Sequence, residues 1–242
     1  MYKKMYKKIS VHALNKTGSM FLYRLFQEIA RMKNIKYFSD NNIPADSNKF
    51  NNCNKICCIC PVRNFPNNLE DDTFYIILLR NPLDILISEY YSWGWMHYLP
   101  KKGFKILNQQ KRNHIRKLSI NEYCKLYSDD LLKRYQPILE IDKNSNNLCI
   151  VKYCDMVLDY KNWLNNVVIY FDLSKLEIDK LYNKFKNEFS NIKELTPNQI
   201  INQGIRRHKR KMYPGDYKNK LTVDTIEKLE IKFKTILNLL NK

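Results

Sequence analysis

Residues 12–21 read HALNKTGSMF and connect an alternating apolar run to a series of apolar residues with helical spacing. The pattern predicts a strand over residues 9–14, a loop, and a helix over residues 19–32. The first amides of a helix have no partner within the helix and carry a partial positive charge, so they can surround an anion. With Lys16 in the loop, the stretch predicts an anion-binding strand-loop-helix unit.

Short apolar runs alternate with longer amphipathic ones along the rest of the chain. They predict strands over residues 55–60, 74–79 and 148–153, and helices over residues 82–91, 119–135, 160–171, 175–189 and 223–240. Asn81 and Pro82 suit the N-cap and first position of a helix, and Asp84 suits its first turn. Strands that alternate with helices indicate an α/β fold, and we expect residues 1–242 to form a single domain with a central parallel sheet flanked by helices, a P-loop-like unit at the N-terminus, and ligands at the C-terminal edge of the sheet.

The composition is strongly basic, with 42 Lys and Arg against 24 Asp and Glu and a net charge of +18. Such a charge attracts anionic ligands, nucleic acid or acidic membrane surfaces, whereas a solvated Lys- and Asn-rich surface is the alternative. No apolar run is long enough to span a bilayer, and the basic N-terminus is followed by no apolar signal segment. We therefore expect a soluble, cytoplasmic protein that does not bind membranes.

Seven cysteines are present, and four of them crowd into residues 53–60. The odd total, together with crowded neighbours that cannot all pair when they lie on one strand, indicates a reducing compartment. Cys57 and Cys60 have the spacing of a metal-binding pair, but no second pair completes four ligands, so we expect small buried side chains and no metal site.

A second candidate site for an anion lies after the strand expected over residues 74–79. Arg80 ends this strand, and Ser88 lies on the helix that begins at Pro82, so both can converge on one phosphate at the edge where the first loop lies. The alternative is that Arg80 pairs with Asp84 while Ser88 fills a small gap.

Four blocks, in the order of a known family, resemble the sulfotransferases that use 3′-phosphoadenosine 5′-phosphosulfate (PAPS), most closely the cytosolic type. They are NKTGSMF at residues 15–21, similar to PKSGTTW; LRNPLDILISEYY at residues 79–91, similar to RNPKDVAVSYY; VKYCDM at residues 151–156, similar to a YEDM segment; and RKMYPGDYKN at residues 210–219, similar to RKGxxGDWKN. The resemblance implies transfer of the sulfuryl group from PAPS to a hydroxyl or amine of a small-molecule acceptor, such as a secondary metabolite. The transfer is an in-line displacement that needs no metal and releases adenosine 3′,5′-bisphosphate (PAP).

The resemblance also implies a role for each matching residue. The loop that binds the 5′-phosphosulfate comprises Lys16, Thr17, Gly18, Ser19, Met20 and Phe21, and the contacts to the 3′-phosphate and adenine come from Arg80, Ser88, Tyr153, Arg210, Lys211 and Met212. Lys16 is the expected catalytic cation, because charge develops on the leaving phosphate. Phe21 is placed to stack on adenine, with a core position as the alternative. Met20 replaces a Thr of the family and Met212 a Gly.

Residues 218–227 resemble the KxxxTVxxxE segment through which cytosolic members form dimers, with matches at Lys218, Thr222, Val223 and Glu227. A homodimer is implied. Read from the residues alone, Thr222 caps the C-terminal helix and the two charged residues lie on its surface.

The family's general base is a His in a KTHLP segment, and the corresponding residues 57–61 read CCICP. The four histidines of the chain are His12, His97, His114 and His208. His97 is the expected base, because it follows the 3′-phosphate helix among aromatic residues that can line an acceptor pocket. Asp46 or Asp40 could serve instead.

Two other functions compete with this interpretation. A nucleic-acid-binding protein is favoured by the charge and by Trp93, Trp95 and Tyr98, and predicts salt-dependent binding to oligonucleotides with no response to PAP. A nucleotide kinase-like phosphotransferase is disfavoured, because Lys16 precedes the glycine of its loop and no GxxxxGK motif is present.

Overall fold

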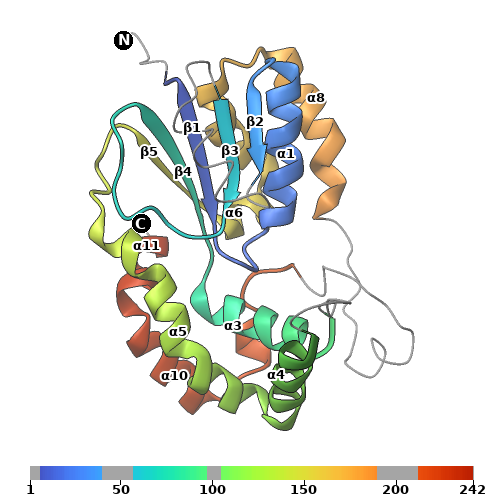
Figure 1. Cartoon of the computed structure of the whole chain (residues 1–242), viewed down its shortest axis with the longest axis vertical. Helices are drawn as coiled ribbons and strands as arrows, with labels where there is room; N and C mark the ends of the chain where they lie inside the picture. The colour runs from blue at the N-terminus through green and yellow to red at the C-terminus, as the bar shows by residue number, and fades with distance from the viewer. Residues whose placement is uncertain (1–5, 40–56, 97–104, 190–211, 242) are drawn as a thin grey trace. The chain divides into compact units, whose positions relative to one another are not determined.

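The computed structural model describes residues 6–39, 57–96, 105–189 and 212–241 (Figure 1). The described chain forms two compact units. The first contains Met1–Arg80 and Arg134–Glu188, and the second contains Asn81–Lys133 and Phe189–Lys242.

A five-stranded sheet in the order β2-β3-β1-β4-β5 forms the centre of the first unit, and all of its neighbouring strands are parallel. Its strands are β1 (Lys8–Ala13), β2 (Lys36–Ser39), β3 (Cys57–Val62), β4 (Thr73–Leu79) and β5 (Leu148–Lys152). Every residue of β1 and β4 is buried, as is typical of central parallel strands covered on both faces. The expected parallel α/β fold is confirmed.

Helices α1 (Ser19–Met32), α7 (Tyr160–Val168) and α8 (Lys175–Phe185) pack together beside this sheet. Helix α1 contacts β3 and α8, and α7 contacts α8 and β5, so the three helices form a layer (Figure 1). The unit also contains α6 (Tyr153–Leu158), the short helices η3 (Ile169–Phe171) and η4 (Lys186–Glu188), and the end of α5 (Ile120–Glu140).

The described part of the second unit is helical. It contains α3 (Pro82–Tyr91), the π-helix η2 (Ser92–Met96), α4 (Lys105–Lys117), the first part of α5, η5 (Asp216–Asn219), α10 (Val223–Lys232) and α11 (Lys234–Asn241). The π-helix is held by α4, because Arg112 and Arg116 donate to the carbonyl oxygens of Trp93 and Gly94 at 3.1 and 2.7 Å.

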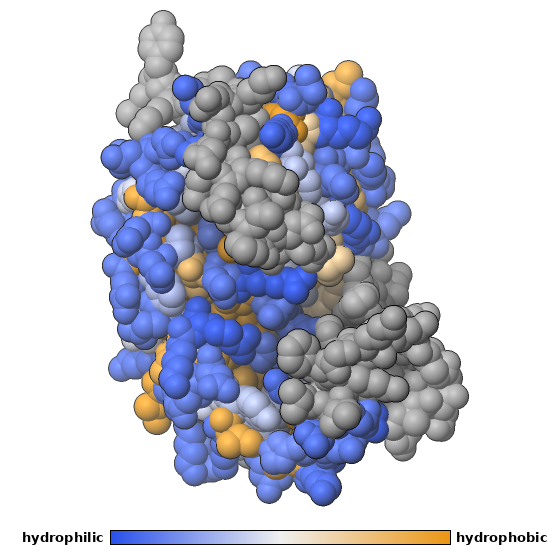
Figure 2. All heavy atoms as spheres, in the orientation of Figure 1, coloured by the Kyte–Doolittle hydropathy of each residue, from blue (hydrophilic) through white to orange (hydrophobic). Residues whose placement is uncertain are grey.

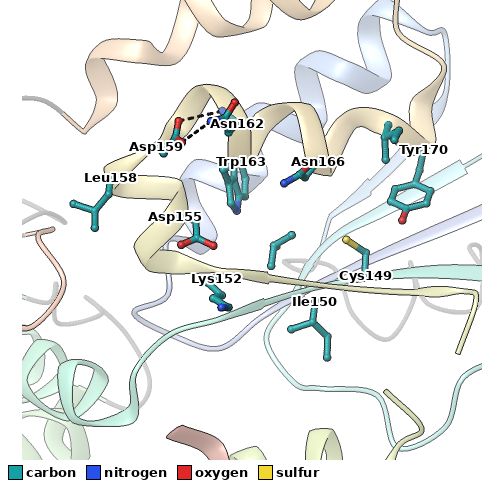
Figure 3. A pocket seen from close by; sticks show the side chains of 12 residues that line it. Cys149, Ile150, Lys152, Asp155, Leu158, Asp159, Asn162, Trp163, Asn166 and Tyr170 are labelled. Atoms are coloured by element: carbon teal, nitrogen blue, oxygen red, sulfur yellow. Dashed lines mark hydrogen bonds between the residues drawn. The ribbon is translucent and has the colours of Figure 1, made fainter. Parts of the chain in front are cut away.

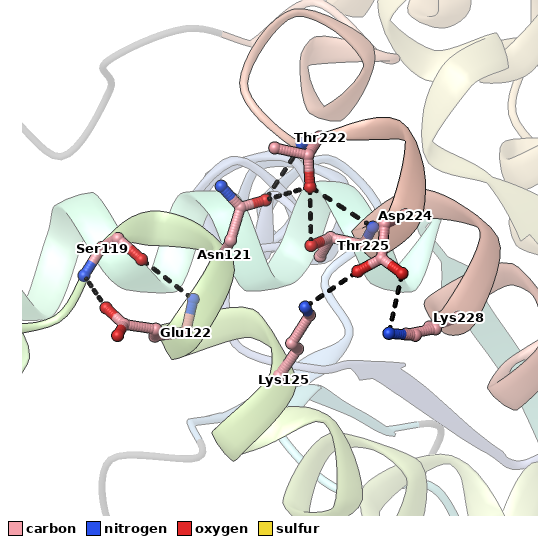
Figure 4. A network of polar contacts seen from close by, with 8 residues as sticks. All are labelled: Ser119, Asn121, Glu122, Lys125, Thr222, Asp224, Thr225 and Lys228. Atoms are coloured by element: carbon pink, nitrogen blue, oxygen red, sulfur yellow. Dashed lines mark hydrogen bonds and ion pairs between the residues drawn. The ribbon is translucent and has the colours of Figure 1, made fainter.

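A polar network joins the start of α5 to the start of α10 (Figure 4). The side-chain oxygen of Asn121 accepts a hydrogen bond from the Thr222 amide at 3.0 Å, and Asp224 lies between Lys125 and Lys228 at 3.0 and 2.7 Å. Thr222 itself caps α10. The network is exposed, so its ion pairs contribute little stability and its main effect is to orient the two helix ends.

Several expected elements have the bounds that the sequence predicted. Helices α1 and α3 are confirmed, and Asn81 caps α3 by accepting a hydrogen bond from the Leu83 amide at 2.9 Å. The prediction of one helix over residues 223–240 is wrong, because the buried Phe233 separates α10 from α11. The sequence did not predict β2, α4 or α6.

The visible face of the molecule is mostly hydrophilic, with hydrophobic residues in small scattered groups (Figure 2). No helix in the described ranges is both long and apolar enough to cross a membrane.

Candidate functional site

The register of the sheet brings three sequence blocks to one edge of the first unit. Ala13 of β1 pairs with Leu78 of β4, so the loop after β1 and Arg80 leave the sheet at the same end. Leu79 pairs with Lys152 of β5, so Arg80 and Tyr153 follow paired residues. The first loop, Arg80 and Tyr153 therefore meet at the carboxyl ends of adjacent parallel strands, where open α/β sheets bind ligands.

The loop between β1 and α1 is shaped by its own hydrogen bonds and by two positive backbone angles. Thr17 is fully buried, and both its amide and its hydroxyl donate to the Leu14 carbonyl oxygen, at 3.3 and 2.6 Å. Lys16 has φ +66° and Gly18 has φ +89°. Thr17 thus holds the loop conformation, and the sharp turn at Gly18 starts α1 directly behind it.

Gly18 occupies the N-cap position of α1 and provides no side-chain hydrogen bond to the first amides of the helix. A Cβ atom there would lie 2.9 Å from the Met156 methyl carbon and 3.5 Å from the Tyr153 ring. Helix α6 therefore packs closely against the loop. The first turn of α1 keeps the partial positive charge of uncapped amides, which is what an anion site needs.

Arg80 is the central residue of this site. Its side chain is buried, its Nη1 atom donates to the Lys16 carbonyl oxygen at 2.6 Å, and its guanidinium carbon lies 4.2 Å from the centre of the Tyr153 ring. The Tyr135 hydroxyl donates to the Arg80 carbonyl oxygen from α5. The cation–π contact and the hydrogen bond to Lys16 hold the guanidinium between the loop and α6, while Tyr135 holds the Arg80 backbone.

The Nε atom of Arg80 is buried and has no hydrogen-bond partner among the described residues. A buried donor without an acceptor costs about 1–3 kcal/mol, and more when it is charged. An anionic oxygen placed beside the loop would supply that acceptor with a charge-assisted hydrogen bond. The residues present therefore fit a phosphate-bearing ligand.

The family model of the sulfotransferase domain matches residues 7–240. The chain belongs to the sulfotransferase domain family. A sequence search of curated proteins finds no match.

Solved sulfotransferase structures share this fold. The crystal structure of mouse sulfotransferase SULT7A1 complexed with PAP has a TM-score of 0.61 and 17% identity, over 96% of this chain and 85% of that one. Retinol dehydratase in complex with androsterone and inactive cofactor PAP has a TM-score of 0.59 and 12% identity, over 96% of this chain and 81% of that one. At these identities the likeness establishes the sulfotransferase fold.

Phe21 occupies the core position that was the alternative to adenine stacking. It is 4% exposed, and its ring centre lies 5.7 Å from those of Tyr160 and Phe185, both edge to face, and 6.2 Å from that of Trp163. This aromatic cluster joins α1, α7 and α8, so Phe21 contributes to the packing of the helical layer.

The other expected donor residues lie in different environments. Met20 is 51% exposed on the first turn of α1, next to the buried Ser19. Ser88 and Met212 are half-buried in the second unit. Arg210, Lys211 and the expected base His97 lie outside the described residues.

His12 is buried on β1 and uses both ring nitrogens. Nδ1 lies 2.6 Å from the Asn64 carbonyl oxygen, which can only accept, so Nδ1 carries the proton and Nε2 accepts from the Ser10 hydroxyl at 2.8 Å. Burial lowers the pKa of His12 to about 4. The residue is a neutral part of the core. His114 is exposed on α4, and His208, Asp40 and Asp46 lie outside the described residues.

A groove of about 540 Å³ lies beside the edge strand β5 in the first unit (Figure 3). Lys152, Asp155, Asn162 and the buried Trp163 line it, together with residues of η3. Among the described residues, no expected donor residue lines this groove, and no sequence motif predicted it.

Gly18→Ala is expected to lower the free energy of unfolding by about 1–2 kcal/mol, because a Cβ at φ +89° is strained and the Met156 side chain must move. Met156→Ala is the matched background, since it removes the methyl group that the new Cβ would meet. Urea denaturation should show a smaller loss on Gly18→Ala in this background than in the unmodified protein. An equal loss would mean that α6 does not press on the loop.

Acid should destabilise the protein through His12. Its pKa is about 4 in the folded state and 6.5 in the unfolded state, so the unfolded state binds the extra proton between these values. The free energy of unfolding therefore falls as the pH drops from 6.5 to 4, by on the order of 3 kcal/mol from this residue. Urea denaturation across this range should give a shallower pH dependence for His12→Gln, and an unchanged slope would contradict the assignment.

Proposed function

We propose that the protein transfers a sulfuryl group from PAPS to a hydroxyl or amine of a small-molecule acceptor, releasing PAP. The observation that carries this proposal is the buried Arg80 guanidinium, fixed against the Lys16 carbonyl with one N–H lacking an acceptor, beside uncapped amides at the start of α1. The solved structures of mouse sulfotransferase SULT7A1 and of retinol dehydratase, both in complex with PAP, support the choice of nucleotide.

The loop residues would hold the 5′ side of the donor. The amides of Gly18, Ser19 and Met20 surround the anion, while the Lys16 ammonium neutralises the charge that develops on the leaving phosphate. Bound PAPS supplies an activated sulfuryl group on that phosphate. Since Met20 has no hydroxyl, only its amide contributes at the position where the family has Thr.

The 3′-phosphate would be held by Arg80, Ser88, Arg210 and Lys211, with Tyr153 near the adenine, as the family resemblance implies. The stacking of Arg80 on Tyr153 supports these two roles, because it places the residue for the phosphate next to the residue for the adenine. Cationic side chains and amides supply the stabilisation that a metal supplies in kinases. His97 remains the proposed base, and a secondary metabolite the proposed type of acceptor.

A homodimer through residues 218–227 also forms part of the proposal. Val223 is 71% exposed, and Thr222 both caps α10 and bonds to Asn121, so the segment presents an apolar side chain on a fixed helix end. A short segment gives a small interface and a concentration-dependent dimer.

The first test is a thermal shift with PAP. At a concentration a hundredfold above the dissociation constant, PAP should raise the melting temperature by about 5–10 °C. Arg80→Ala should abolish most of this shift, because it removes the buried cation. Arg31→Ala, which removes an exposed Arg paired with Glu28, should keep it.

No stabilisation by PAP, or a full shift in Arg80→Ala, would contradict the proposed donor site. Stabilisation by ATP with magnesium instead would favour a phosphotransferase. Salt-dependent binding of oligonucleotides without a response to PAP would favour the nucleic-acid function.

The dimer is tested by sedimentation velocity over a range of protein concentrations. Val223→Glu should raise the dimer dissociation constant at least tenfold, because it places a charge in the apolar contact. Ile231→Glu is the matched control, since Ile231 is also exposed on α10 but lies outside the segment. Equal effects of both variants, or a monomer at every concentration, would exclude this interface.

A further inference from the structure

Asp84 is a buried carboxylate whose partners are backbone amides. It lies in the first turn of α3 and is 1% exposed. Its two oxygens accept hydrogen bonds from the amides of Gly215 and Tyr217, at 2.7 and 3.3 Å. Burial of a charged group is costly unless its hydrogen bonds are satisfied, so these contacts hold the turn firmly against α3.

The turn is built to receive this carboxylate. Gly215 has φ +85° and precedes η5, and the Lys218 amide donates to the Gly215 carbonyl oxygen at 3.2 Å. A left-handed residue beside a helical one directs neighbouring amides to the same side and forms an anion-binding concavity. Asp84 fills this concavity, and Tyr217 is buried beside it.

The same face of α3 carries a residue of the proposed donor site. Asp84 and Ser88 are four residues apart, so they lie one turn from each other on one side of the helix. The turn that Asp84 binds therefore packs on the helix face that presents Ser88, and the chain reaches this turn through Met212.

We propose that Asp84 is a positioning residue for recognition of the 3′-phosphate, an inference that rests on the proposed function. It touches no part of the ligand. It fixes the turn at residues 213–217 relative to Ser88 through its two hydrogen bonds with amides.

The test compares two ligands that differ only in the 3′-phosphate, PAP and adenosine 5′-monophosphate, by isothermal titration calorimetry. Asp84→Asn replaces one accepting oxygen with an NH₂ group, so the dissociation constant for PAP should rise at least tenfold while that for the monophosphate stays within twofold. Asp129→Asn, which removes an exposed carboxylate paired with Lys232 in the same unit, should change neither.

Gly215→Ala provides the second variant. Its Cβ meets no neighbour, so the variant should fold, but the strained backbone shifts the amides away from Asp84. It should show the same selective loss of PAP affinity, and it decides the question if Asp84→Asn does not fold.

Each outcome has a distinct meaning. If the variants still prefer PAP over the monophosphate by the same ratio of dissociation constants as the wild-type protein, Asp84 does not have the proposed role. The proposed function would remain intact. An equal loss for both ligands would show a merely structural role and also overturn the proposed role of Asp84. Wild-type protein that binds PAP no better than the monophosphate would overturn the proposed function, and this inference with it.

Discussion

A buried guanidinium needs hydrogen-bond acceptors, and the one at Arg80 has partners in two other segments while its Nε atom has no acceptor among the described residues. Its contacts with the Lys16 carbonyl and the Tyr153 ring join the ends of β1, β4 and β5. The positive angle at Gly18 and the close approach of Met156 complete this packing. The site depends on Arg80 because this buried cation contacts both the first loop and Tyr153 of α6.

The same sequence block contains a second buried charge of opposite sign. The Arg80 guanidinium donates to a carbonyl oxygen and Asp84 accepts from two amides, so each anchors a loop within its own unit. Both residues belong to LRNPLDILISEYY, with Asn81 and Pro82 between them setting the start of α3. One short block therefore anchors a loop in each unit and also sets the start of a helix. Charged groups that are buried and satisfied by backbone groups define loop positions more sharply than apolar contacts do.

Three side chains in and beside the first loop have structural environments of their own. Phe21 belongs to an aromatic core, Met20 is exposed, and His12 is a neutral structural residue. The fold of the family therefore does not fix the role of each side chain in this region. Fold and anion recognition depend on backbone geometry, whereas acceptor activation depends on individual side chains.

The sequence by itself determined the parallel α/β class, the bounds of α1 and α3, and the family, because apolar periodicity, Asn-Pro capping and the motif blocks are local features. It missed β2 and α4, which are short or polar, and the break at Phe233. Only the tertiary structure decided which residues Arg80 and Phe21 contact. Those contacts join residues far apart in the chain, and strand register and helix packing, which no local pattern encodes, determine which buried group meets which partner.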